Sequence, residues 1–349
     1  MSAGSPPDPD DLISHYINHL ETTGRNPGTV RTYRIVLPRF RAFLNDYSMS
    51  LGEVTEPECI DFISSLKDKL ALSTVRLYAG CVNRFYQFYS SQGTFEKNPM
   101  EFALKETNVT PQNDRHRREI SLNDMREFIQ NTGHPQLRTI LVLFGKTGIR
   151  AGEMANLDLR DLYIDHSGAR RELPEPRPEL AGKPDSLFIA DSRINKGDVV
   201  NGDRRTAGNK RKNATIVPLD DELKQTALYW VAARPPSRSE ASPLFLTRGA
   251  SSNCEIGDRI TVPAIHSGIQ KRAEERGWYS KGAGVQNNVT PHYFRHWFTT
   301  IADRNMDRSV VRYIRGDVGS DIVDSNYRHF WGSEVHKEYS ANICKLFLS

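Results

Sequence analysis

The sequence predicts a mainly α-helical protein with a small antiparallel β-sheet in its second half. Apolar residues recur at three- and four-residue steps through most of the chain, which is the spacing of amphipathic helices. Three short runs typical of β-strands, residues 162–164, 187–189 and 215–217, follow one another in the second half. Because loops separate these runs, we expect them to pair as a small antiparallel sheet.

The length of the chain predicts two domains, since 349 residues exceed what one hydrophobic core usually supports. Residues 1–10, rich in proline and aspartate, predict a flexible tail. A helical pattern occupies residues 11–107, although its periodicity stops after Gly93. Residues 108–118 have the polar, proline-containing composition of a linker, and residues 119–349 are expected to form the second domain.

Amphipathic helices account for most of the first domain. One follows the turn at Asn26 to Gly28 and contains Pro38, where we expect a kink. Another covers residues 55–69, and a third begins with Ser73 as its N-cap. Their aromatic residues are expected in the core, while arginines on the opposite faces suit either a phosphate backbone or solvent alone.

Basic residues gather in clusters, although the net charge of the chain is only +4. The clusters lie at residues 115–118, 204–205 and 210–212. Patches of this kind suit a polyanionic partner, and the alternative for any one of them is a solvated surface.

No membrane partner and no metal are expected from the sequence. No apolar run approaches the roughly 18 residues that a membrane-spanning helix needs. The four cysteines are scattered without a C-x-x-C pair, which predicts reduced thiols in a cytosolic protein rather than a zinc site.

A candidate anion-binding arginine occurs where a helix of the second domain begins. A buried helix is predicted at residues 137–144, and the next helix starts just after Arg150. The glycine and threonine residues before Arg150 permit a tight turn, which places this arginine near a helix N-terminus, where anions bind favourably. Glu153 follows one turn later and is expected to orient Arg150.

Two further features supply groups that transfer protons. Pro291 begins a predicted helix on which His292 and Arg295 share one face. A lysine, Lys210 or Lys212, lies in the turn between the last two predicted strands, which we expect to be a mobile hairpin. Each feature is common by itself. Taken alone, either could consist of solvated polar residues without a catalytic role.

The chain resembles the tyrosine recombinase family, the phage-integrase type of site-specific recombinase. It carries, in the order of that family, Arg150 in a Thr-Gly-Ile-Arg-x-x-Glu motif, a hairpin lysine, His292-x-x-Arg295 and a late Tyr327. The resemblance covers nearly the whole chain. It implies that the first domain is a helical core DNA-binding domain and the second a catalytic domain.

The resemblance also implies the chemistry of the nucleophile and the arginines. Tyr327 would attack the scissile phosphate and form a 3′-phosphotyrosyl link with a free 5′-hydroxyl. Arg150 and Arg295 would hold the phosphate, because guanidinium groups stay charged and bind two oxygens at a time. Since side chains supply the positive charge, the resemblance implies neither a metal nor another cofactor.

The proton carriers follow from the same resemblance. Lys210, eight residues before Pro218, would protonate the departing 5′-oxygen, with Lys212 as its competitor. His292 would handle the proton of the tyrosine. By their charge, Arg117, Arg118 and Arg211 are the candidate DNA contacts. Glu153 is a supporting residue of the site rather than a DNA contact.

One position departs from the family. Most members place a second histidine, in Leu-Gly-His, about ten residues before the tyrosine, whereas this chain has Asp317 at the end of Ile-Arg-Gly-Asp. A carboxylate would repel the charge of a phosphoryl transition state, so we expect Asp317 to make a structural hydrogen bond. Arg315 is the candidate replacement donor, and His296 and His329 are alternatives. The variant is similar to archaeal members of the family.

The resemblance implies double-stranded DNA as the partner and a homotetramer on two DNA sites, in the cytoplasm with the nucleoid. An apolar stripe after the nucleophile would dock on a neighbouring protomer or pack on its own domain; its members are Trp331, Val335, Tyr339, Ile343 and Phe347. Two other functions compete with recombination: a type IB topoisomerase that relaxes DNA, and a non-catalytic DNA-binding regulator.

Overall fold

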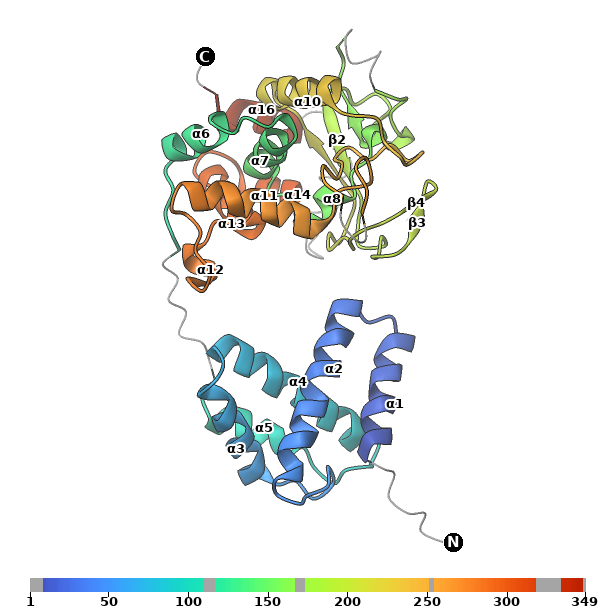
Figure 1. Cartoon of the computed structure of the whole chain (residues 1–349), viewed down its shortest axis with the longest axis vertical. Helices are drawn as coiled ribbons and strands as arrows, with labels where there is room; N and C mark the ends of the chain where they lie inside the picture. Colours follow the sequence, from blue (N-terminus) through green and yellow to red (C-terminus); the bar gives the residue numbers. More distant parts are fainter. Residues whose placement is uncertain (1–8, 110–116, 167–172, 251–253, 318–333, 348–349) are drawn as a thin grey trace. The chain divides into compact units, whose positions relative to one another are not determined.

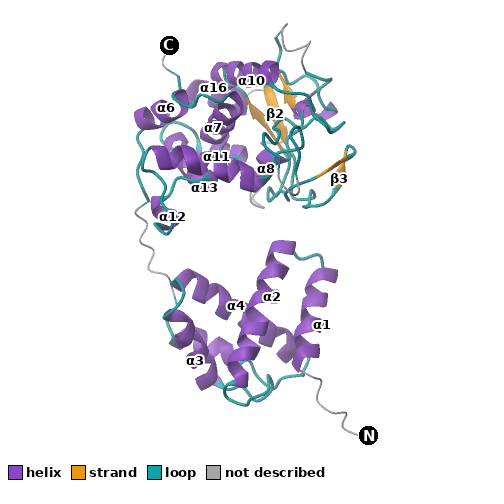
Figure 2. Cartoon of the chain, viewed as in Figure 1, coloured by secondary structure: helices purple, strands orange, loops and turns teal. Residues whose placement is uncertain are grey.

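The structure is a computed structural model that describes residues 9–109, 117–166, 173–250, 254–317 and 334–347 (Figure 1). The chain divides into two compact units, Met1–Asp114 and Arg115–Ser349. Helices dominate both units and short strands occur in the second, which confirms the predicted fold class (Figure 2). Within the described ranges, no helix is both long and apolar enough to cross a membrane.

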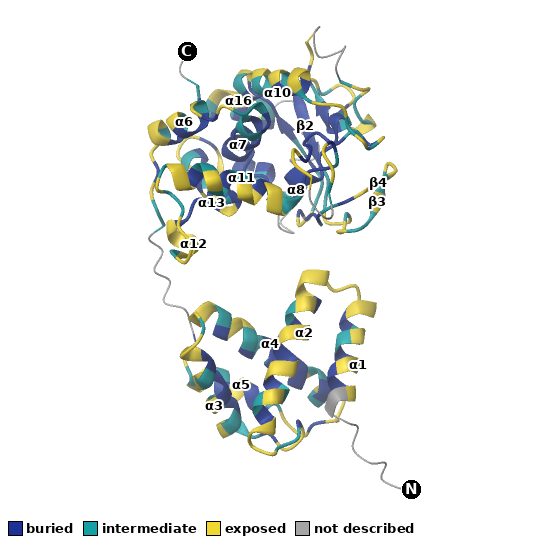
Figure 3. Ribbon diagram, in the orientation of Figure 1, coloured by how far each residue is buried: buried dark blue, intermediate teal, exposed yellow. Residues whose placement is uncertain are grey.

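Helices α1 to α5 form the first unit around an aromatic core. Their bounds are α1 Pro9–Thr22, α2 Pro27–Asn45, α3 Glu56–Lys67, α4 Leu72–Ser91 and α5 Pro99–Glu106. Asn26 caps α2, because its side chain accepts a hydrogen bond of 2.9 Å from the backbone N–H of Gly28. In the core Phe40 meets the rings of Phe62 and Tyr86 edge-on. Each helix buries one face and exposes the other (Figure 3).

Two details of the first unit differ from the prediction. The N-cap of α4 is Ala71 rather than Ser73, so this helix begins earlier than expected. Helix α5 was not predicted, because its eight residues bury only Pro99, Met100 and Ala103, which is too short a pattern to show a period.

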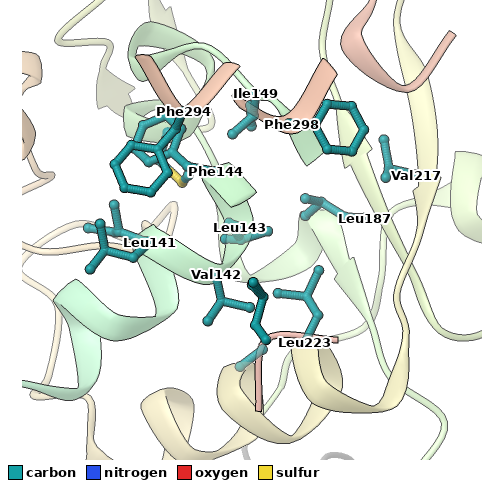
Figure 4. Packing of buried hydrophobic residues seen from close by; sticks show 14 of the residues in the cluster. Leu141, Val142, Leu143, Phe144, Ile149, Leu187, Val217, Leu223, Phe294 and Phe298 are labelled. Atoms are coloured by element: carbon teal, nitrogen blue, oxygen red, sulfur yellow. The ribbon is translucent and has the colours of Figure 1, made fainter. Parts of the chain in front are cut away.

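The second unit is built around helix α7. Its helices are α6 Leu122–Gln130, α7 Pro135–Thr147, α8 Ala151–Ala155, α10 Asp221–Ala233, α11 Val262–Glu275, α12 Gly284–Asn287, α13 Pro291–Ala302, α14 Arg308–Arg315 and α16 His336–Asn342. Every residue of α7 from Thr139 to Thr147 is buried, because α10 and α13 pack against it. Figure 4 shows Phe144 of α7 beside Phe294 of α13, with ring centroids 5.9 Å apart.

A three-stranded antiparallel sheet lies beside this core, as predicted. Its strands are β1 Leu162–Tyr163, β2 Ser186–Ile189 and β5 Thr215–Pro218, in the order β1-β2-β5. Leu187 is paired with Leu162 on one side and with Val217 on the other. Two further strands were not predicted and pair with each other in a separate sheet. They are β3 Val199–Val200 and β4 Asp203–Arg204, which lie between β2 and β5 in the sequence. Two-residue strands are too short to give an alternating pattern in the sequence.

The described part of the C-terminal stripe packs on its own unit, which is the second of the two alternatives for it, and Trp331 lies outside the described residues. Val335, Tyr339 and Ile343 are buried in the same core as α7. The backbone N–H groups of Leu346 and Phe347 donate to the Glu222 carboxylate at 2.8 and 2.9 Å. These bonds tie the end of the chain to the start of α10.

Candidate active site

Arg150 is placed by a glycine turn between α7 and α8. Helix α7 ends at Gly148, whose φ of 57° is left-handed. A Cβ at this position would lie 2.7 Å from the ring of Phe298, so glycine is needed for α13 to approach so closely. Arg150 then caps α8 and is held by the buried Glu153, which accepts from its backbone N–H at 3.2 Å and from its Nη1 at 3.0 Å.

Arg295 reaches the same turn from α13. Its side chain is buried, and its Nη1 donates to the carbonyl oxygens of Gly148 at 2.7 Å and of Arg315 at 2.9 Å. Burial, reinforced by the charge of Arg150, lowers the pKa of Arg295 to about 10. The guanidinium therefore stays charged at neutral pH.

Asp317 joins three arginines. Its Oδ1 accepts from Nη2 of Arg150 at 2.7 Å and from Nη2 of Arg295, and its Oδ2 pairs with Nη2 of Arg315 at 2.7 Å. Burial opposes ionisation of this carboxyl, but the positive charges of Arg295, Arg315 and Arg150 hold its pKa below the usual value. Asp317 makes hydrogen bonds within the protein, as the sequence predicted, and it accepts where the family's histidine would donate.

Lys210 lies on a segment that is anchored on both sides. The preceding Asn209 is buried and donates to the carbonyl of Ala190 at 2.9 Å. The following Arg211 is 0% exposed, whereas Lys210 and Lys212 are exposed. Lys210 therefore lies between two buried residues, which the sequence did not predict because a hydrophobic pattern does not reveal that the polar neighbours of a lysine are buried.

One pocket of about 330 Å³ brings the predicted residues together. Arg150, Lys210, His292 and Arg295 all line it, while Lys212 does not. The elements meet here because α8 and α13 both pack against α11 (Figure 1). His266 of α11 also lines the pocket. His266 was not predicted, because a single histidine on an amphipathic helix gives no signal in the sequence.

His292 is suited to accept a proton. Although more than a third of its surface is exposed, burial of the ring lowers its pKa, and the charges of Arg117 and Arg295 lower it further. The imidazole is therefore neutral at pH 7, with one ring nitrogen free of a proton.

The remaining candidates lie elsewhere. Arg211 was predicted to contact DNA, which is wrong: its guanidinium is fully buried and pairs with Glu153 at 3.3 Å, so it cannot reach a phosphate. Arg117 and Arg118 line a second pocket of about 590 Å³ together with His296. His296 does not line the pocket that contains Arg150, Lys210, His292 and Arg295, so it stays an alternative for the missing histidine. Tyr327 and His329 fall outside the described residues.

Comparisons with known proteins point to one family. Residues 13–93 match the family described as "Phage integrase, N-terminal SAM-like domain". Tyrosine recombinase XerC of Staphylococcus carnosus is 28% identical over 320 residues, which cover 89% of each chain. Tyrosine recombinase XerA of Pyrococcus horikoshii is 20% identical and covers 88% of this chain and 85% of its own. Because a bacterial and an archaeal protein both match, the archaeal assignment stays a prediction.

Solved structures share the fold. The Tn1549 transposon integrase in complex with transposon right end DNA has a TM-score of 0.64 at 16% identity, covering 96% of this chain and 98% of that one. A lambda integrase dimer bound to a COC′ core site has a TM-score of 0.60 at 13% identity, covering 93% and 78%. The match over residues 13–93 and the similarity to XerC along most of the chain support membership of the tyrosine recombinase family, and the solved structures show that the fold is shared.

Proposed function

We propose that the chain is a site-specific DNA recombinase that cuts and rejoins DNA strands through a 3′-phosphotyrosyl intermediate. The observation that carries this proposal is the pocket lined by Arg150, Lys210, His292 and Arg295. These four residues come from segments far apart in the sequence, yet they supply the two phosphate ligands and two proton carriers that the reaction needs. Tyr327 is the proposed nucleophile.

Arg150 and Arg295 hold the scissile phosphate. The Nη2 atoms of both arginines donate to the same oxygen of Asp317, so their geometry already suits one shared anionic oxygen. A phosphate oxygen is an acceptor of the same kind. Both guanidinium groups remain charged throughout the reaction and offset the negative charge that develops around phosphorus.

The reaction exchanges one phosphodiester bond for another. The Tyr327 oxygen forms a bond to phosphorus while the bond from phosphorus to the 5′-oxygen breaks. His292, neutral because its pKa is lowered, takes the phenol proton. Lys210 gives a proton to the departing 5′-oxygen. Attack by a 5′-hydroxyl on the phosphotyrosine reverses these transfers and rejoins the strand without ATP.

Double-stranded DNA is the proposed partner, and a homotetramer on two DNA sites is the proposed assembly. Exchange between two duplexes needs four strand cuts, hence four active sites related by cyclic contacts. The first unit acts as the core DNA-binding domain, residues 11–107, and the catalytic domain is residues 119–349. Arg117 and Arg118, which lie between these two ranges in the sequence, are the proposed phosphate contacts. Such an enzyme acts where the chromosome lies, with the nucleoid in the cytoplasm.

A plasmid assay tests this function against its two competitors. A binding site is first selected from a pool of randomised duplexes and then placed zero, one or two times in a supercoiled plasmid. Recombinant products that require two sites are the expected result. Relaxation without recombination would instead indicate a type IB topoisomerase activity. A mobility shift with neither product would indicate a DNA-binding regulator.

A further inference from the structure

We infer that Arg211 is a positioning residue of the active site, which locks the segment bearing Lys210 against the elements that carry Arg150 and Asp317. The inference rests on the proposed function, because it concerns the reaction that Lys210 and Arg150 carry out. Arg211 itself is fully buried, so it acts through its neighbours and touches no substrate.

The contacts of Arg211 join three elements. Its Nη2 donates to Glu153 of α8 at 3.3 Å, and the other oxygen of Glu153 holds Nη1 of Arg150 at 3.0 Å. Its Nη1 donates to the carbonyl of Ile314 in α14 at 3.0 Å and to the hydroxyl of Thr215 in β5. One side chain thus connects the lysine segment with the helix behind Arg150 and the helix that ends before Asp317.

Gly316 adds a steric contact to this connection. Its φ of 69° is left-handed, and a Cβ at this position would lie 2.5 to 2.7 Å from the Cγ, Cζ and Nε atoms of Arg211. Arg211 is fixed by its hydrogen bonds and cannot move aside cheaply. Glycine is therefore needed for the turn before Asp317 to lie directly on the arginine side chain.

The other side of the lysine segment is fixed as well. A Cβ on Gly152 would lie 2.7 Å from the carbonyl oxygen of Gly208, so α8 and the segment touch through their backbones. The side chain of Asn156 donates to Ala207 O at 2.8 Å and to Asn209 Oδ1 at 2.9 Å. Lys210 is exposed between these anchors and Arg211, so loss of Arg211 frees one side of it.

A buried ion pair is weak evidence for stability, because removing two charges from water costs about as much as their attraction returns. An apolar side chain of similar length would fill the same space. The specific position of Arg211, with partners on α8, α14 and β5, is explained by the spacing that it imposes on Arg150, Lys210 and Asp317.

Single-turnover cleavage of the selected site tests the inference with Arg211→Met. One substrate is an ordinary phosphodiester, and the other carries a 5′-thiolate leaving group that needs no protonation. We expect the variant to cleave the ordinary substrate about 100-fold more slowly, a loss of roughly 2.7 kcal/mol at about 1.36 kcal/mol per factor of ten. We expect at least ten-fold of that loss to be recovered with the thiolate, while DNA affinity changes less than about two-fold.

Arg205→Met is the matched control. Arg205 is also buried on this segment and pairs with Asp158 at 2.8 Å, but it bonds to neither α14 nor Glu153. It should lose stability without selective rescue by the thiolate. If Arg211→Met loses the same factor on both substrates, or only in proportion to its unfolded fraction, Arg211 has a structural role alone and the inference is overturned.

A second test does not depend on catalysis. Arg211→Met and Gly316→Ala should both increase amide hydrogen exchange by at least about ten-fold in residues 207–213. Gly277→Ala is the control for Gly316→Ala, because Gly277 has a similar φ of 67° but no atom within 4 Å of an added Cβ. Unchanged exchange in both variants would overturn the positioning role. A wild-type enzyme that cleaves neither substrate would contradict the proposed function instead.

Discussion

The core of the first unit is apolar and aromatic, whereas the core of the second unit also contains charged side chains. Within the described residues, all buried charged side chains belong to the second unit: Lys146, Glu153, Asp158, Asp161, Arg205, Arg211, Asp220, Arg259 and Arg295. A buried charge is costly unless it is paired. Ion pairs connect Arg150 and Arg295 to Asp317 in the second unit, so we expect this unit to be more sensitive than the first to substitutions that remove one partner of a pair.

The largest effect is expected from breaking one of these ion pairs. Lys146 is fully buried and pairs with Asp220 at 2.6 Å and Glu222 at 2.7 Å. Lys146→Met keeps the length of the side chain but removes the buried cation between the two carboxylates, and Asp220 keeps only the more exposed Lys345 at 3.3 Å. It should therefore lower the free energy of unfolding of the second unit by about 3–5 kcal/mol. Met100→Leu, at a fully buried site of the first unit, should cost less than about 1.5 kcal/mol.

Tryptophan fluorescence during urea unfolding measures the second unit separately. All four tryptophans lie in that unit: Trp230, Trp278, Trp297 and Trp331. Far-UV circular dichroism reports both units together. Equal losses for Lys146→Met and Met100→Leu would contradict the contrast between the two cores.

Arg150→Ala should slow strand cleavage by about 10²–10³-fold, because it removes a preorganised donor to the phosphate. Binding of the selected site should remain measurable. Arg34→Ala is the control in the first unit, where the side chain is 56% exposed and pairs with Glu21. Losing Arg34 should leave the cleavage rate at saturating protein unchanged and reduce the salt dependence of binding by at most about one phosphate contact. A similar loss of cleavage in both variants would contradict the assigned site.

Asp317→Asn should slow cleavage by about ten-fold. The amide keeps the shape of the carboxylate but weakens charge-assisted hydrogen bonds to Arg150, Arg295 and Arg315, each worth about 1.5–3 kcal/mol. The arginines then lose their spacing. Faster cleavage by this variant, measured in single turnover, would show that repulsion between Asp317 and the phosphate outweighs its positioning effect.

The smallest effect concerns pH. The pKa of His292 is lowered, so its neutral, proton-accepting form persists as pH falls. The cleavage rate should therefore stay constant from pH 8 down through about 6.5, the ordinary histidine value, and decline only below it. His292→Asn should remove that decline and lower the plateau. A wild-type midpoint at or above the ordinary value would contradict this role for His292.

The sequence predicted the features that follow from local pattern. Helices α2 and α3 and the three strands of the antiparallel sheet follow from periodicity and turn residues, and the four residues of the pocket follow from the motifs that carry the family resemblance. The burial of Arg211 was not predictable, because arginine is ordinarily exposed and its partners at Glu153 and Ile314 are distant in sequence. The three arginines around Asp317 likewise meet only after folding.

Trapping the covalent intermediate tests the central claim most directly. A nicked duplex that carries the selected site loses its short 5′-hydroxyl fragment after cutting, so the strand cannot be rejoined. Wild-type protein should form a protein–DNA adduct on this duplex in the presence of EDTA. Tyr327→Phe should bind the same duplex with similar affinity, because it loses one oxygen and no charge, yet form no adduct. An adduct with Tyr327→Phe, or no wild-type adduct in EDTA, would contradict the metal-free phosphotyrosine mechanism.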